Sequence, residues 1–156
     1  MSKEAASQLE ELLGRETAEL EALTGLLEQE RDALARSDVD SLLGIVDKKS
    51  RSTAVLEQIE SQRLALLQAV NQQNITDFIE YNPGDNTSLA SAWFRFTRAA
   101  EACQRLNQIN GMAMMQYRQH VARMMAILAG QSGNENTYGP DGSLDYAASG
   151  KAGLKA

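Results

Sequence analysis

The sequence predicts an all-α protein: an elongated antiparallel bundle or coiled coil of three long helices, followed by a flexible C-terminal tail. Apolar residues recur every three or four positions over three long stretches, which is the spacing of one helix face. Both prolines, Pro83 and Pro140, lie outside these stretches. Residues 130–156 hold six of the eleven glycines and few apolar groups. We therefore expect a helical domain over residues 1–130 and a flexible tail over 131–156.

The composition is that of one soluble domain of 156 residues, with 43% hydrophobic and 23% charged residues. A net charge of -6 argues against binding to nucleic acid or to anionic membranes, because such proteins present excess lysine and arginine. The single cysteine, Cys103, excludes an intrachain disulfide and is expected to be a small buried hydrophobe. The first eleven residues contain no apolar run, so we expect no signal peptide, no membrane insertion and a cytoplasmic location.

The first predicted helix, Lys3 to Arg36, carries leucines at heptad spacing. Glu16 and Glu30 interrupt this apolar row, and a lone buried carboxylate is costly. We expect each glutamate to be solvated or to meet a cation. Basic residues of the third helix are the expected partners, because that helix has a net charge of +4 over residues 88–129 against -5 for the first helix.

The second predicted helix, Asp38 to Asn71, follows a break in the leucine register. Ser37, with Asp40 three residues later, resembles an N-terminal cap. The break is either a reversal, which gives a hairpin, or a kink in one long rod; no glycine or proline forces a turn there, and we favour the reversal. Lys49 and Arg63 occupy apolar positions of this helix, where long basic side chains can reach to solvent.

The segment from Asn71 to Asn86 is polar and closes with a Pro-Gly turn, so it predicts a loop. Within it, one helical turn is expected to cover the end of the bundle with Ile75, Phe78, Ile79 and Tyr81. The third helix then runs from Ser88 to Gly130, about forty residues or roughly 60 Å. The buried residues of this helix are expected to include Trp93, Phe96 and Leu106.

The second half of the third helix is apolar nearly all round, with fourteen apolar residues among the twenty-one from Ile109 to Ala129. One row is expected to face the first two helices: Met114, Tyr117, Val121, Met124 and Leu128. A second row points away and is either covered by the loop, the tail or a second copy, or forms a groove for a partner helix. The candidate binding residues are Leu106, Asn110, Met112, Met115, Met125 and Ala126.

The residue types argue against an enzyme. A di-metal site in a helical bundle needs histidines from two helices, and His120 is the single histidine. Cys103 and His120 are seventeen residues apart on one helix, roughly 25 Å, which is too far for a nucleophile pair. There is no glycine-rich phosphate loop and no zinc-ligand spacing. We expect no catalytic residues, no metal and no cofactor.

Several short motifs resemble the FlgN family of flagellar export chaperones. In the first half these are Leu9-x-x-Leu12-Leu13, Leu26-Leu27-x-x-Glu30-Arg31-x-x-Leu34 with Asp38, and Gln62-Arg63 with Leu66-Leu67. In the second half they are Cys103-x-x-Leu106-Asn107-x-x-Asn110-Gly111 and Tyr138-Gly139-Pro140-Asp141-Gly142. The helix, the Asn-Gly step and the tail motif follow in the family's order, and the resemblance extends to Gly142.

This resemblance implies a cytosolic chaperone that binds the C-terminal amphipathic segments of hook-filament junction proteins. It also implies delivery to the cytosolic domain of the flagellar export gate, with Tyr138 as the docking residue. Two other classes stay open from the residues alone: a coiled-coil scaffold or self-associating spacer, including a homodimer, and a helix lying on a membrane surface. The last is disfavoured because the end of the third helix has only Arg118 and Arg123 as charges.

Overall fold

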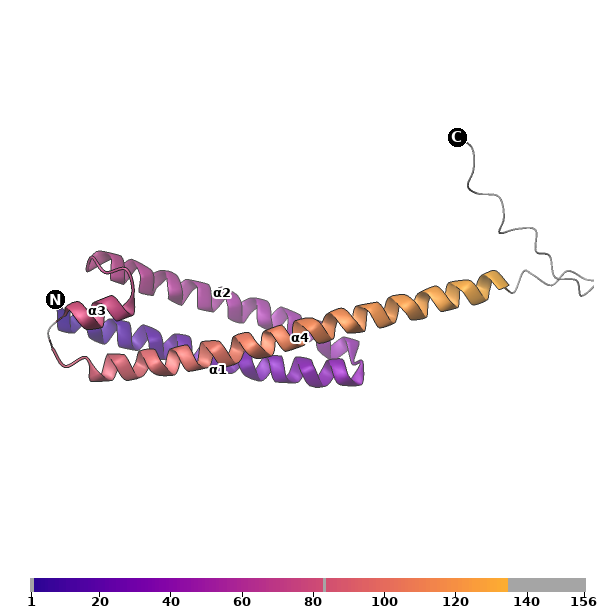
Figure 1. Ribbon diagram of the computed structural model, residues 1–156, viewed down its shortest axis with the longest axis horizontal. Helices are drawn as coiled ribbons and strands as arrows, with labels where there is room; N and C mark the ends of the chain where they lie inside the picture. Colours follow the sequence, from indigo (N-terminus) through magenta and orange to yellow (C-terminus); the bar gives the residue numbers. More distant parts are fainter. Residues whose placement is uncertain (1, 83, 135–156) are drawn as a thin grey trace, which may run out of the picture. The chain divides into compact units, whose positions relative to one another are not determined.

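The computed structural model describes residues 2–82 and 84–134, which form four α-helices and no strand (Figure 1). The helices are α1 (Ser2–Arg36), α2 (Val39–Ala69), α3 (Ile75–Tyr81) and α4 (Thr87–Asn134). The all-α prediction is confirmed, but there are four helices rather than three, because the expected single turn after Asn74 is a helix of its own. The predicted boundary at residue 130 falls inside α4. The chain divides into two compact units, residues 1–114 and residues from 115 onward.

The helices α1 and α2 form an antiparallel hairpin, so the favoured reversal is correct. Ser37 makes the turn with a left-handed backbone, φ 55°, although it is not a glycine. Its N–H donates to the Leu34 carbonyl at 3.2 Å, and the Asp38 N–H donates to the Ala33 carbonyl at 2.9 Å. The N-cap of α2 is Asp38, not Ser37: its carboxylate accepts from the N–H and the hydroxyl of Ser41 at 3.1 and 2.6 Å.

One end of the first unit is closed by α3 over a shared apolar cluster. Asn74 caps α3 by accepting from the Asp77 N–H at 2.8 Å. The buried residues Ile75 and Phe78 then pack with α1, α2 and α4, in a cluster that also contains Ala5, Leu9, Leu13, Leu67, Leu89 and Ala92. Tyr81, expected to join them, is exposed. The short helix thus buries two of the four side chains that the sequence assigns to it and leaves Ile79 partly buried.

A second apolar cluster lies between α1 and α4, where Leu20 and Leu27 pack with Cys103. Cys103 is buried and free, as expected of a small hydrophobe. Trp93, Phe96 and Leu106 are only half-buried, although they pack against these clusters. The Trp93 and Phe96 rings stack at 5.3 Å, which places two broad aromatic groups beside each other at the edge of the core.

The two glutamates in the apolar row of α1 are paired with cations of α2, so the expectation of partners on the last helix is wrong. Arg63 donates to Glu16 from Nε at 2.7 Å and from Nη2 at 3.3 Å. Lys49 Nζ donates to both carboxylate oxygens of Glu30 at 3.0 and 3.1 Å. The antiparallel hairpin brings these seam positions together, whereas the arginines of α4 lie on exposed positions. Arg63 therefore binds its carboxylate inside the bundle, whereas Lys49, with 25% of its side chain exposed, binds Glu30 and still reaches solvent in part.

Burial also affects the charge state of Glu16. Removal of the carboxylate from water raises the pKa of Glu16, while the hydrogen bond and positive charge of Arg63 lower it by a smaller amount. The Arg63 guanidinium in turn lies 5.4 Å from the centre of the Phe96 ring. Arg63 thus makes two hydrogen bonds to the Glu16 carboxylate and packs over the face of the Phe96 ring.

Candidate functional site

Helix α4 carries an exposed apolar surface in its second half. From residue 115 to 130, only Tyr117 is half-buried and every other residue is exposed. Val121, Met124 and Leu128, predicted to face the first two helices, are 41%, 48% and 55% exposed. The periodicity shows which face could be buried, but α4 has 48 residues against 35 in α1 and 31 in α2. The hairpin helices are therefore too short to line the whole length of α4.

The predicted binding residues fall into two groups. Met112, Met115 and Met125 are 57%, 57% and 64% exposed, and Ala126 is exposed as well. Leu106 is half-buried beside the cluster of Leu20, Leu27 and Cys103. The other member of the second group, Asn110, is only 2% exposed. The sequence-predicted set is thus divided between a solvent-facing surface and the interior of the bundle.

Asn110 is held by α1. Its Nδ2 donates to the Leu27 carbonyl at 2.6 Å and to the Glu30 carboxylate at 2.8 Å, while its buried Oδ1 has no hydrogen-bond partner. Glu30 therefore receives an amide from α4 as well as the ammonium of Lys49 from α2. This cluster joins three helices at one level of the bundle. Tyr138, the predicted docking residue, lies outside the residues that the structure describes.

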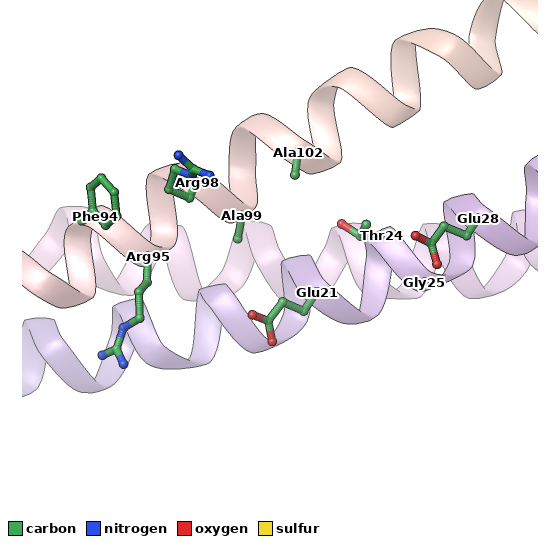
Figure 2. A pocket seen from close by; sticks show the side chains of 9 residues that line it. All are labelled: Glu21, Thr24, Gly25, Glu28, Phe94, Arg95, Arg98, Ala99 and Ala102. Carbon is green, nitrogen blue, oxygen red and sulfur yellow. The ribbon is translucent and has the colours of Figure 1, made fainter.

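A groove between α1 and α4, with a volume of about 770 Å³, lies entirely within the first unit (Figure 2). Its walls carry opposite charges, Glu21 and Glu28 from α1 and Arg95 and Arg98 from α4. Smaller residues line the space between them: Thr24, Gly25, Ala99 and Ala102. Phe94, 63% exposed, stands at the edge, and in Figure 2 it projects from α4 on the side away from α1.

A smaller hollow of about 260 Å³ shares Glu21 and Arg95 with this groove and adds Gly14, Thr17, Ala18 and Ala92. Glycine, alanine and threonine give no strong apolar signal, so the leucine pattern does not reveal either space. The usable signal is the recurrence of small residues on one face of α1, at Gly14, Ala18 and Gly25.

Within residues 2–82 and 84–134, no group of three or more His, Cys, Asp or Glu side chains is placed to hold a metal ion. None of the helices in that part of the chain is long and apolar enough to cross a membrane.

Comparison with protein families identifies one relation. Residues 1–145 match the family model described as FlgN protein. No curated protein and no solved structure matches the chain. Because the family match covers most of the 156 residues, the chain belongs to the FlgN family, a family of non-enzymatic flagellar export chaperones.

Proposed function

We propose that this chain acts in the cytosol by binding the C-terminal amphipathic helices of hook-filament junction proteins and delivering them to the cytosolic domain of the flagellar export gate. The observation that carries the proposal is the exposed apolar surface of α4 in a member of the FlgN family. A large exposed apolar surface marks an interaction site. For an export chaperone, the fitting occupant is a segment of its cargo.

An amphipathic helix is the cargo element that suits this surface. It presents apolar side chains at i, i+3, i+4 and i+7 and can lay them along another helix. The exposed row of Met112 and Met115 continues at Ala126 with the spacing of one helix face. Methionine is unbranched and polarizable, so it can repack around more than one cargo sequence. The two junction proteins would require this adaptability.

A double variant tests the cargo surface. Met112→Asp with Met115→Asp places two carboxylates in the apolar row, and we expect at least about a tenfold loss of affinity for peptides from the C-termini of the junction proteins, measured by calorimetry. Both methionines are more than half exposed, so the melting temperature should change little. Met112→Leu with Met115→Leu is the matched control, because it keeps the apolar surface and should keep the affinity.

The outcome of this pair of variants is decisive for the surface. If the aspartate variant stays folded and binds the peptides as tightly as the unchanged chain, the cargo lies elsewhere. If the leucine variant also loses binding, the row acts through the shape of methionine rather than through apolar contact.

Delivery to the gate is tested at Tyr138. Tyr138→Ala, and removal of residues 135–156, should each abolish binding to the cytosolic gate domain and leave peptide binding unchanged. The truncation retains the whole of α4, so the cargo surface stays complete. Gate binding by Tyr138→Ala at full strength would show that the role implied by the family does not apply to this residue.

A further inference from the structure

We infer that the groove between α1 and α4 is the contact surface between two copies of this chain, packed face to face with their helices running in the same direction. The inference goes beyond the proposed function and rests on different residues, all within the first unit. Three properties of the groove point to a second copy: unpaired charges of opposite sign on its two walls, the level of those charges along the helices, and an exposed aromatic side chain beside a hollow of small residues.

The four charged groups of the groove have no ion-pair partner among the residues that the structure describes. Glu21 and Glu28 stand on α1, and Arg95 and Arg98 on α4. Within the described part of the chain, none of the four takes part in an ion pair; the ion pairs join Glu16, Glu30, Asp47 and Glu60 to Lys49, Arg51 and Arg63. Arg98 lies 5.9 Å from the centre of the Phe94 ring. One wall is therefore acidic and the other basic, and neither is neutralised by the other.

The two walls are also in register along the bundle. Two contacts fix the level of α4 against α1: Ser88 bonds Glu10, 78 residues earlier, and Asn110 bonds Glu30, 80 residues earlier. A residue of α1 therefore lies level with the residue about 79 positions later on α4. Glu21 is then level with the region of Ala100, about two residues or 3 Å along the axis from Arg98. Glu21 and Arg98 therefore face solvent at nearly one height, whereas Glu28 is level with the region of Asn107, about nine residues beyond Arg98.

This arrangement is self-complementary under one symmetry. A two-fold axis parallel to the helices places α1 of one copy over α4 of the other at the same level, so Glu21 meets the partner copy's basic wall, and the contact occurs twice. A two-fold axis across the helices would instead place acidic wall on acidic wall, which costs energy by like-charge repulsion. The charges thus select the parallel pairing.

The shape of the surface agrees with the charges. In the parallel pairing, Phe94 of one copy lies level with the region of Gly14 to Ala18 in the other, which is the hollow beside the groove. A Cβ built on Gly14 meets no other atom within 4 Å, so the space above it is open. Phe94, 63% exposed at the edge of its own groove, is an aromatic group of the kind that anchors interfaces. Each copy supplies one such ring and one hollow at the same level.

Charge reversal tests the pairing. In sedimentation velocity of the full chain, we expect the unchanged protein to form a dimer in reversible equilibrium with the monomer. Glu21→Arg with Glu28→Arg, and separately Arg95→Glu with Arg98→Glu, should each weaken self-association by about tenfold or more. An equimolar mixture of the two variants should restore a dimer, because each wall again meets its opposite. A protein that is monomeric at every concentration, or a mixture that stays monomeric, would overturn the inference.

A steric variant covers the case in which the charge variants fail to fold. Gly14→Gln adds a long side chain in the hollow, where its Cβ meets no other atom within 4 Å, and improves the helix propensity. We expect it to melt no lower than the unchanged protein and to be monomeric. Gly44→Gln is the matched control: it makes the same change on α2, also with no atom within 4 Å of the new Cβ, and should leave the dimer intact. A dimeric Gly14→Gln variant would overturn the inference.

The same variants separate this inference from the proposed function. Peptides of the junction proteins should bind the groove variants with unchanged affinity, since the proposed cargo surface is on the second half of α4. If Gly14→Gln instead loses peptide binding, the groove takes the cargo and not a second copy. If no variant and not even the unchanged chain binds the peptides, the proposed function is wrong. The dimer is then still tested independently by sedimentation velocity.

Discussion

Replacing Arg63 by methionine probes the buried ion pair most directly. The Glu16 side chain is only 3% exposed and that of Arg63 10%, so the substitution leaves a carboxylate inside the bundle without its cation. Breaking such a pair from one side typically costs about 3–5 kcal/mol. The variant can limit the loss by protonating Glu16. From an unfolded-chain pKa of about 4.3, protonation at pH 7 costs about 3.7 kcal/mol, so we expect a loss of about 3–4 kcal/mol.

The stability lost in Arg63→Met should depend on pH with a definite sign. Without Arg63, the pKa of Glu16 in the folded chain rises further above its unfolded value, because desolvation is no longer opposed. The group then favours folding fully below the unfolded pKa, and that contribution is lost as the pH rises. Protonation costs only about 1 kcal/mol at pH 5, so the difference between Arg63→Met and the unchanged chain should shrink on acidification.

Urea unfolding followed by circular dichroism at pH 7 and pH 5 measures both quantities. The control is the double variant Glu16→Met with Arg63→Met, which removes both charges, fills a similar volume and keeps an apolar contact for Phe96. It should recover most of the lost stability, since paired removal of buried charges is often neutral or stabilising. A single variant within about 1 kcal/mol of the unchanged chain, or a loss that stays constant with pH, would refute the argument.

Three further substitutions test the packing and the turn. Leu27→Ala, at a site 1% exposed, should lower the free energy of unfolding by about 2–5 kcal/mol in the same urea assay; a loss under about 1 kcal/mol would mean that the cluster is loosely packed. Ser37→Gly should raise the melting temperature and stabilise by up to about 1 kcal/mol, because glycine adopts the positive φ of 55° without strain, and a destabilised variant would contradict this. Asp38→Ala should cost about 0.5–2 kcal/mol by removing both bonds to Ser41, whereas Asp38→Asn should retain most of the cap.

The long helices could be predicted from the sequence because leucine spacing reports which face of a helix is apolar. It does not report which neighbour covers that face. Net charge favours the basic last helix as the partner of the glutamates of α1, but the partners are Lys49 and Arg63, which stand at apolar positions of α2. A charged residue at an apolar position of one helix is best matched with an oppositely charged residue at an apolar position of the neighbouring helix. Net charge does not show where on a helix the charges lie.

The binding surfaces were predictable to different degrees. The all-round apolar character of α4 pointed to Met112, Met115 and Met125, and these are exposed. Asn110 belongs to the same predicted set, yet it hydrogen bonds with Glu30 inside the bundle, and the sequence pattern does not show which residues of two helices lie level with each other. The spaces beside Gly14 and Gly25 exist because small residues leave room between α1 and α4. The spacing of apolar residues contains no signal for such a space, so the sequence does not predict it.

The two ion pairs of the hairpin have a consequence for how the chain folds. A row of leucines at heptad spacing makes nearly the same apolar contacts after one helix slides by seven residues. Apolar contact alone therefore leaves several alignments of the two helices close in energy. The residue numbers of both pairs, 16 with 63 and 30 with 49, sum to 79, so both form in one alignment only. A slip of seven residues separates each of these four charged groups from its partner but leaves the group between the helices. An unpaired charge in that position destabilises the misaligned hairpin. Misaligned hairpins are therefore too unstable to accumulate during folding. We expect the hairpin to refold without a slow phase caused by realignment of its two helices.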